Sequence, residues 1–211
     1  MQFNLSEYIH KSNPNIIEAG AGNGEDIVDL ARIFPNGKLY TFEPNIDQYH
    51  IVKNTLNQHH ISNVELYGNA LGEETGLELD FHVSDRFGQP WGSSSLMKPK
   101  EHLNGAPDIT FNKTIKVKTV NLDDFIKKKG IEVIDYLELD LQGYEPEIVK
   151  SSPLTISKTK YFLTEINTKE TYENNMLYPE YKEMLLSMDF EIINESFEGM
   201  QGNVLLVNKK L

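Results

Sequence analysis

Apolar residues along the chain alternate between the periodicities of strands and helices. Ile16 and Ile17 predict a buried strand, and the next segment repeats apolar side chains at the i, i+3, i+4 and i+7 spacing of one helix face. Further strand patterns occupy 38–43 and 63–71, with a helical pattern over 45–59 between them. Strands and helices that alternate at this spacing predict half of a parallel sheet with right-handed crossovers.

The second half of the chain continues the alternation and closes with a hairpin pattern. A short helix is expected at 5–11, strands at 77–83, 114–120, 133–141 and 161–166, helices at 121–129, 145–150 and 179–189, and closing strands at 190–197 and 203–208. Residues 84–112 have no periodicity and hold the only tryptophan, Trp91. Long irregular stretches in a compact domain are usually binding loops, lids or disorder. We expect this one to cover the substrate and to be mobile without it. It belongs to a substrate-side insertion, 77–120, in a single domain that spans 1–211.

Charge and cysteine content limit which kinds of partner and site the chain can have. The chain has 32 acidic and 20 basic residues, a net charge of −12, which disfavours nucleic acid or an anionic membrane surface as the main partner. The absence of cysteine excludes disulfides, thiolate metal sites and cysteine nucleophiles, and is compatible with the cytoplasmic location that we expect. No apolar run approaches the roughly 18 residues of a membrane span. We therefore expect neither nucleic acid nor a membrane as the main partner.

Three glycines, Gly20, Gly22 and Gly24, follow the first predicted strand and open the first helix. Glycine lets the backbone adopt positive φ and approach a ligand closely. A dinucleotide-binding turn has the pattern Gly-x-Gly-x-x-Gly, but its third glycine would fall at Glu25. Glu25 and Asp26 also occupy the helix start where a pyrophosphate would bind. The pattern favours a ligand with a cationic part over NAD, although a glycine turn that only packs helix on strand is a further alternative.

Polar side chains follow successive predicted strands. They are the acids Glu18, Glu43, Asp140 and Glu165, with Asn69 near the end of the third strand. Ligands of open α/β sheets bind at the carboxyl ends of the strands, so these side chains are expected at one site. Glu43 lies 23 residues after Gly20, the separation expected for an acid that accepts both hydroxyls of a ribose. The alternative for Glu43 is an acid at a helix start before Pro44.

These motifs resemble known methyltransferases. The pattern Glu-x-Gly-x-Gly-x-Gly from Glu18 resembles motif I of class I S-adenosylmethionine (SAM) methyltransferases. Six further segments resemble the FkbM family of these enzymes. They are Phe42-Glu43-Pro44, Asn69-Ala70-Leu71-Gly72, Gly92-Ser93-Ser94-Ser95-Leu96, Val120-Asn121-Leu122-Asp123-Asp124, Asp140-Leu141-Gln142-Gly143-Tyr144-Glu145 and Glu165-Ile166. Two departures are the glycine turn, where the family more often has Asp-Val-Gly-Ala-Asn, and Glu138–Leu141, where a lysine commonly precedes the aspartate. The second leaves open the charge of the substrate side.

The resemblance implies a Rossmann-like class I methyltransferase fold. This α/β fold has a seven-stranded, mostly parallel sheet with helices on both faces, here with a small strand-and-loop insertion. The implied activity is SAM-dependent O-methylation of a hydroxyl on a sugar, glycan or natural product. The alternatives are an NAD-dependent oxidoreductase and a non-catalytic SAM-binding module.

The resemblance also assigns expected roles to residues. The SAM-binding set is Glu18, Gly20, Gly22, Gly24, Glu43, Asn69, Ala70 and Asp140. Within it, Glu18 and Asp140 are expected at the ammonium group, Glu43 at the ribose, and Asn69 with Ala70 at the adenine. The acceptor-binding candidates are Trp91, Ser94, Ser95, Gln142 and Tyr144.

Two acids, Glu165 and Asp140, are the catalytic candidates. We favour a site without metal, in which Glu165 orients or deprotonates the acceptor hydroxyl. The alternative is Mg²⁺ bound by Asp140, Glu165 and Asn167, because carboxylate and amide oxygens suit that ion.

Overall fold

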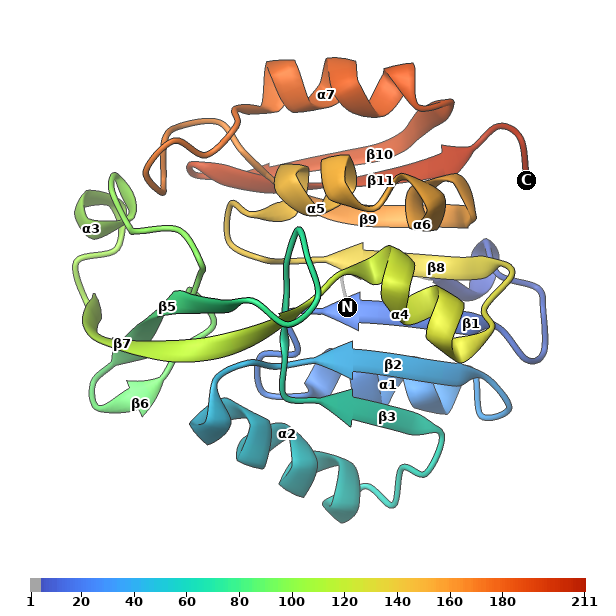
Figure 1. Cartoon of the computed structure of the whole chain (residues 1–211), viewed down its shortest axis with the longest axis horizontal. Helices are drawn as coiled ribbons and strands as arrows, with labels where there is room; N and C mark the ends of the chain where they lie inside the picture. The colour runs from blue at the N-terminus through green and yellow to red at the C-terminus, as the bar shows by residue number, and fades with distance from the viewer. Residues whose placement is uncertain (1–4) are drawn as a thin grey trace.

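The computed structural model describes residues 5–211, which contain a main sheet and a smaller second sheet (Figure 1). The main sheet has seven strands in the order β10-β11-β9-β8-β1-β2-β3. Their bounds are β1 Asn15–Ala19, β2 Lys38–Phe42, β3 Val64–Tyr67, β8 Ile134–Leu139, β9 Thr159–Asn167, β10 Phe190–Glu198 and β11 Gln201–Asn208. Strands β9, β8, β1, β2 and β3 are parallel, and the β10–β11 hairpin joins β9 antiparallel. The predicted seven-stranded, mostly parallel sheet is confirmed.

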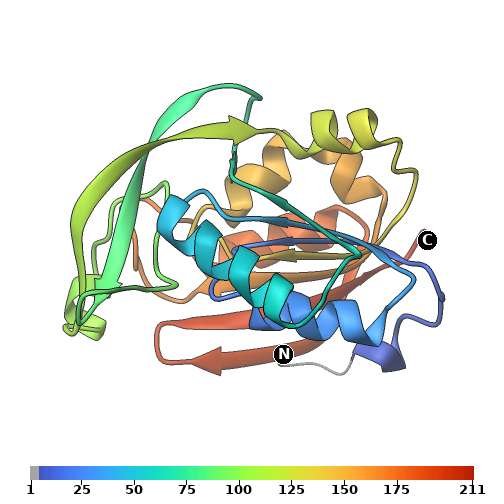
Figure 2. The ribbon, with the colours of Figure 1, turned by 90° about the horizontal axis from the view of Figure 1, so that it is seen from below.

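Helices cover both faces of this sheet (Figure 2). Their bounds are α1 Glu25–Ile33, α2 Ile46–Gln58, α4 Leu122–Lys129, α5 Glu145–Ser151, α6 Pro153–Ser157 and α7 Tyr178–Ser187. Ile16 packs in the core beneath α1 and α2, whereas the adjacent Ile17 packs in the core beneath the other four helices. This division follows from the alternation of side chains along a strand. Sequence patterns missed α6, and the helix expected at 5–11 is only a 3₁₀ turn at Leu5–Glu7.

The second sheet arises from the insertion and has the order β4-β7-β5-β6. Its elements are β4 Ala70–Leu71, β5 Glu78–Arg86, β6 Gln89–Pro90, α3 His102–Gly105 and β7 Ile109–Val120. The strand expected at 63–71 is divided, because β3 ends at Tyr67 and β4 pairs with β7 instead of β2. Strands β5 and β7 cover the two ends of the segment expected to be irregular, 84–86 and 109–112, and β6 lies within it. His82 of β5 also bridges to Ser95 of that segment.

The remaining part of that segment is fastened to the loop between β9 and α7. The backbone N–H groups of Lys100 and His102 donate to the Thr171 carbonyl oxygen at 2.9 and 3.1 Å. The Glu173 N–H donates to the carbonyl oxygen of Lys98 at 2.8 Å. The expected mobility stays a prediction, and motion of residues 98–102 would have to break these bonds. Within residues 5–211, no helix combines the length and apolar character needed to cross a bilayer.

Candidate functional site

A cavity opens at the carboxyl ends of the parallel strands and spans about 600 Å³ of space, part of which is open to solvent. Turns after β1, β2, β3 and β8 form its floor, and the second sheet with its loop forms the opposite wall. Nine of the predicted site residues line it, namely Gly20, Gly22, Glu43, Asn69, Ala70, Trp91, Ser94, Asp140 and Tyr144. The prediction that acids after successive strands converge is therefore correct for Glu43 and Asp140.

Glu43 is the buried acid of this cavity. It follows β2, its backbone N–H donates to the Tyr67 carbonyl oxygen at 2.9 Å, and its Oε1 accepts the Asn45 N–H at 2.8 Å. Burial raises the pKa of Glu43 to about 8, although the bond from Asn45 works in the opposite direction. An acid held this way, with few protein donors, is ready to accept hydrogen bonds from a ligand.

Two polar groups that sequence reasoning missed lie beside Glu43. Asn45 and Gln48, at the start of α2, line the cavity and are 1% and 6% exposed. Within the described part of the chain, Asn45 Nδ2 and Gln48 Oε1 have no hydrogen-bond partner. A buried donor and acceptor without partners are costly unless a ligand satisfies them. The only signal for Asn45 in the sequence is that asparagine commonly caps the start of a helix, and its Oδ1 does accept the Asp47 N–H.

The glycine turn brings two strand ends together. Gly20 has φ 97°, and a Cβ there would lie 2.0 Å from the carbonyl oxygen of Asp140. Glycine is thus required for the turn after β1 to reach the turn after β8. Gly24 lies outside the cavity lining, where its φ is 84° and a Cβ would lie 3.2 Å from the Val52 side chain, so the glycine allows α1 and α2 to pack closely.

Glu18 is buried below the cavity and does not belong to its lining. It accepts a hydrogen bond from the Thr41 hydroxyl and pairs in register with Glu138 of β8. Burial, and next the neighbouring Glu138, raise the pKa of Glu18 well above its ordinary value. Because Glu18 lies outside the cavity lining, its expected role at the SAM ammonium, directly or through water, stays a prediction.

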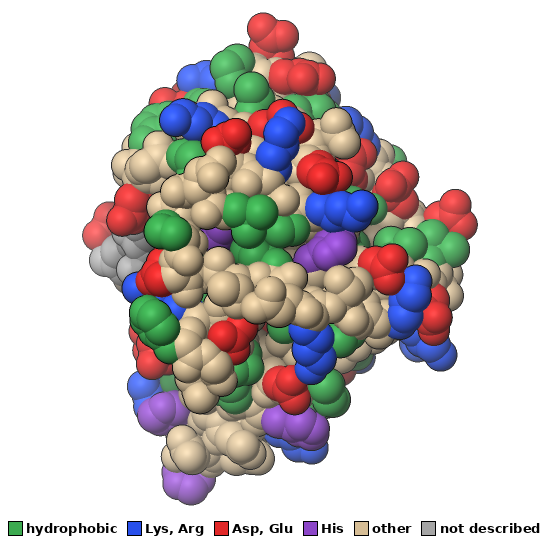
Figure 3. Space-filling view, turned by 90° about the vertical axis from the view of Figure 1, so that its left-hand side faces the viewer, with side chains coloured by type: hydrophobic (Ala, Val, Ile, Leu, Met, Phe, Trp, Pro, Cys, Tyr) green, Lys and Arg blue, Asp and Glu red, His purple; other side chains and the backbone are tan. Residues whose placement is uncertain are grey.

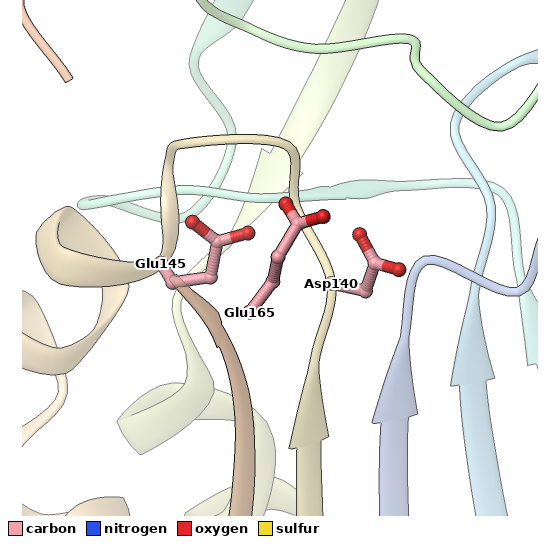
Figure 4. A group of neighbouring side chains, drawn as sticks. All are labelled: Asp140, Glu145 and Glu165. Atoms are coloured by element: carbon pink, nitrogen blue, oxygen red, sulfur yellow. The ribbon is translucent and has the colours of Figure 1, made fainter. Parts of the chain in front are cut away.

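A group of three acids adjoins the floor of the cavity. Asp140, Glu145 and Glu165 each offer an oxygen within 4.8 Å of the others (Figure 4). Of the three, Asp140 lines the cavity. Glu145 accepts the backbone N–H groups of Leu141 at 2.6 Å and Gly143 at 3.0 Å, and so holds the turn after β8.

Glu165 lies behind this turn. Its Oε1 accepts the Gln142 side-chain amide at 3.0 Å, while its buried Oε2 has no partner among the described residues. Burial, followed by the charges of Asp140 and Glu145, raises the pKa of Glu165 well above its ordinary value. Burial also raises the pKa of Asp140. The sequence alternative of a metal at Asp140, Glu165 and Asn167 requires revision, because Asn167 Oδ1 accepts the Thr171 hydroxyl and Glu145 completes the close group.

Two of the five acceptor candidates are engaged inside the protein. The Ser95 hydroxyl donates to the Gln142 carbonyl oxygen at 2.9 Å, and the Gln142 amide bonds to acids. Neither lines the cavity, so the expectation that Ser95 and Gln142 bind the acceptor directly is not supported by their positions.

Trp91, Ser94 and Tyr144 do line the cavity. The Arg86 guanidinium covers the ring of Trp91 at 4.7 Å, and Ser94 Oγ accepts the Ser84 N–H at 2.9 Å. Tyr144 donates to Glu73 at 3.3 Å, and burial raises the pKa of Tyr144 to about 12, so its phenol is neutral at physiological pH.

This arrangement defines a class I SAM-dependent methyltransferase. The first parallel strand ends in a glycine turn, the second ends in a buried acid, and a cavity with unsatisfied polar groups lies between them. The residues present fit SAM, because Glu43 can accept ribose hydroxyls and Asn45 and Gln48 offer a free donor and acceptor.

Comparison with known proteins identifies the family. The family model described as "Methyltransferase FkbM domain" matches residues 18–192. The 2-O-methyltransferase NoeI of Sinorhizobium fredii is 31% identical over 206 residues, which cover 96% of this chain and 83% of that protein. The methyltransferase sdnD of Sordaria araneosa is 24% identical, with 89% of this chain and 77% of that protein covered. The chain belongs to the FkbM methyltransferase family and is a SAM-dependent O-methyltransferase.

Solved structures agree on the fold. TrmK of M. capricolum in complex with S-adenosylhomocysteine (SAH) has a TM-score of 0.56 at 13% identity, covering 99% of this chain and 69% of that chain. The precorrin-6y C5,15-methyltransferase of Geobacter metallireducens has a TM-score of 0.54 at 10% identity, covering 96% and 84%. At these identities the likeness concerns the Rossmann-like architecture alone.

Proposed function

We propose that the acceptor is a sugar or glycan and that its 2-hydroxyl receives the methyl group. The observation that carries this proposal is the Asp140 carboxylate, which faces the cavity between the glycine turn and the wall that contains Trp91 and Ser94. A hydroxyl acceptor needs such a group, because a positioned base assists the loss of its proton. The likeness to a 2-O-methyltransferase over nearly the whole chain supports the choice of hydroxyl.

The acceptor lies against the second sheet in this proposal. Phe81, Trp91 and Leu96 give that wall an apolar surface, and Ser94 and Tyr144 add hydroxyl groups. Sugars present both kinds of surface, since their C–H faces pack on aromatic rings and their hydroxyls form hydrogen bonds. The chain acts as one domain, with 77–120 as its acceptor-side part.

Figure 3 shows acidic and basic side chains interspersed on the face toward which the carboxyl ends of the strands point, and the net charge is −12. Both observations favour a small acceptor over nucleic acid.

SAM supplies an electrophilic methyl group on a sulfonium. Glu43 would accept the ribose hydroxyls, Asn45 and Gln48 would satisfy further polar atoms of the nucleoside, and Asn69 with Ala70 would lie beside the adenine. Asp140 lines the cavity and takes the role that we expected for Glu165, namely to orient the acceptor hydroxyl and receive its proton. Glu165 does not line the cavity and acts through Gln142, whose side-chain amide bonds to both carboxylates. Much of the catalysis comes from positioning the acceptor oxygen in line with the methyl group.

The reaction proceeds without a metal in this proposal. The side-chain nitrogen of Gln142 lies 2.6 Å from Asp140 Oδ1 and 3.0 Å from Glu165 Oε1. A hydrogen-bond donor thus occupies the place between the two carboxylates that a cation would take.

An acceptor screen tests the proposal. Purified protein is incubated with SAM and methyl glycosides of common hexoses and deoxyhexoses, each paired with its 2-deoxy counterpart, and with simple phenols and carboxylates. We expect methylated product from a glycoside but not from its 2-deoxy counterpart, with the position assigned by NMR. Methylation of only phenols or carboxylates would contradict the sugar assignment. SAH binding without turnover of any acceptor would favour a non-catalytic module.

A further inference from the structure

The side chain of Gln142 joins two acids that come from different strands. Its Nε2 lies 2.6 Å from Asp140 Oδ1 and 3.0 Å from Glu165 Oε1. An amide nitrogen carries two hydrogens, so each carboxylate accepts one of them. Gln142 is also 7% exposed and adopts φ 56°, a left-handed conformation that non-glycine residues seldom adopt. The backbone is therefore locally strained at Gln142, the residue whose side chain bonds to both acids.

Tyr172 determines which end of this amide faces the acids. Its hydroxyl lies 2.9 Å from Gln142 Oε1 and 2.8 Å from the Ser93 carbonyl oxygen. Both partners are acceptors, so the hydroxyl hydrogen is shared between them in a three-centre bond. The bond keeps Oε1 on the Tyr172 side and leaves Nε2 toward the carboxylates. If the amide rotated by half a turn, an oxygen would face two acids.

Tyr172 itself packs against both the insertion and the turn after β8. It is fully buried, its ring packs against His102 and Phe111, and Pro99 forms a β-bridge with it. A Cβ at Gly143 would lie 3.2 Å from the Tyr172 ring, so the turn after β8 packs directly on this tyrosine. Tyr172 thereby connects the acceptor-side insertion to the acid group.

We propose that Gln142 and Tyr172 are positioning residues for methyl transfer. Gln142 holds the carboxylates of Asp140 and Glu165 side by side, and Tyr172 holds the oxygen of that amide away from them. The inference rests on the proposed role of Asp140 as the proton acceptor. The charged and titratable groups near the pair are Asp26, from the start of α1, Glu138, on β8, Glu145, from the start of α5, and Tyr172 itself.

Three variants test this inference. Gln142→Met keeps the side-chain length and removes both hydrogen bonds, whereas Tyr172→Phe keeps the ring and frees the amide to rotate. Tyr181→Phe is the matched control, because Tyr181 is also buried and its hydroxyl bonds at 3.0 Å to Thr164, next to Glu165. Tyr172→Phe remains informative if Gln142→Met fails to fold.

The first measurement needs no acceptor. Carboxyl ¹³C NMR follows the titration of Asp140 and Glu165, assigned with Asp140→Asn and Glu165→Gln proteins. Loss of a hydrogen bond to an ionised group disfavours ionisation, so the titration midpoints should rise by about one pH unit in Gln142→Met. A smaller rise is expected in Tyr172→Phe and none in Tyr181→Phe. SAH affinity by calorimetry should stay within about threefold, since neither side chain lines the cavity.

With an active acceptor from the screen, the kinetics should follow the titrations. We expect kcat to fall about tenfold in Gln142→Met and Tyr172→Phe, with the acidic limb of the pH profile displaced upward and the KM for acceptor unchanged.

Two results would overturn the inference. One is unchanged titration midpoints in Gln142→Met and Tyr172→Phe, with only a loss of thermal stability that matches Tyr181→Phe. The other is Mg²⁺ binding that perturbs the carboxyl signals of Asp140 and Glu165 and the Gln142 side-chain amide, because a cation would then replace the amide. Shifted titrations without methylation of any glycoside would support the positioning role and contradict the sugar acceptor.

Discussion

Replacing Glu43 with glutamine should weaken SAM and SAH binding and remove most of its pH dependence. The carboxyl is buried in the cavity and its pKa is raised to about 8. In the proposed complex its ionised form would accept two ribose hydroxyls, and each hydrogen bond to a charged group is worth roughly 1.5–3 kcal/mol. Glutamine keeps one neutral acceptor oxygen and presents a donor to the second hydroxyl, so the loss of about one such bond predicts a decrease in affinity of roughly 10- to 100-fold.

The same acid predicts how binding varies with pH. Below pH 8 the free protein carries a proton on Glu43, and this proton must leave before the carboxylate can accept ribose hydroxyls. Affinity should therefore fall as pH falls through 8, by about 25-fold between pH 8.5 and pH 6.5. At pH 7 the binding of SAH should release about one proton per molecule.

Calorimetry in two buffers of different ionisation enthalpy measures both quantities. Glu43→Gln should bind SAH weakly, with little proton release and a nearly flat pH dependence. Glu78→Gln, which changes an exposed acid on β5, should behave as the wild type. Wild-type affinity in a folded Glu43→Gln protein, or a pH dependence that persists in it, would refute the ribose contact.

The other predictions concern Asp140, metal, stability and the glycine turn. Asp140→Asn should lower kcat by about 100-fold or more. EDTA should leave the wild-type rate unchanged. Activity that is lost on chelation and restored by Mg²⁺ would contradict the metal-free site. Burial raises the pKa of Glu43 to about 8 and of Glu138 to about 7. When folding raises the pKa of an acid, the free energy of unfolding falls as pH rises from about 4.5 to the pKa of the folded protein. The fall is up to ~1.4 kcal/mol per pH unit for each such acid. The ligand-free protein should melt higher at pH 6 than at pH 8.5, and Glu138→Gln should reduce the difference. Gly20→Ala should abolish SAH binding or folding, whereas Gly22→Ala, with no atom within 4 Å of its Cβ, should cost less in melts and calorimetry.

Local sequence patterns were sufficient for the first two strand–helix units of the parallel sheet. Apolar periodicity located β1, α1, β2 and α2, since each pattern depends on which side chains alternate or repeat within one element. The glycine spacing and Glu43 located the cofactor edge, because the carboxyl ends of parallel strands meet there. The same reasoning failed at 63–71, where a strand pattern runs across two sheets.

Only the tertiary structure decided which side chains meet. Glu18 follows the same sequence rule as Glu43, yet its side chain lies beneath the turn beside Thr41 and Glu138. Gln142 contacts Glu165, 23 residues away, and Tyr172 contacts Gln142 and Ser93 from 30 and 79 residues away. No periodicity encodes such contacts, because they depend on strand register and on how the insertion packs over the main sheet. The sequence by itself therefore determined the fold class and the cofactor edge. Long-range packing decided that Asp140 faces the cavity, that Glu165 lies behind it, and that Gln142 bonds to both acids.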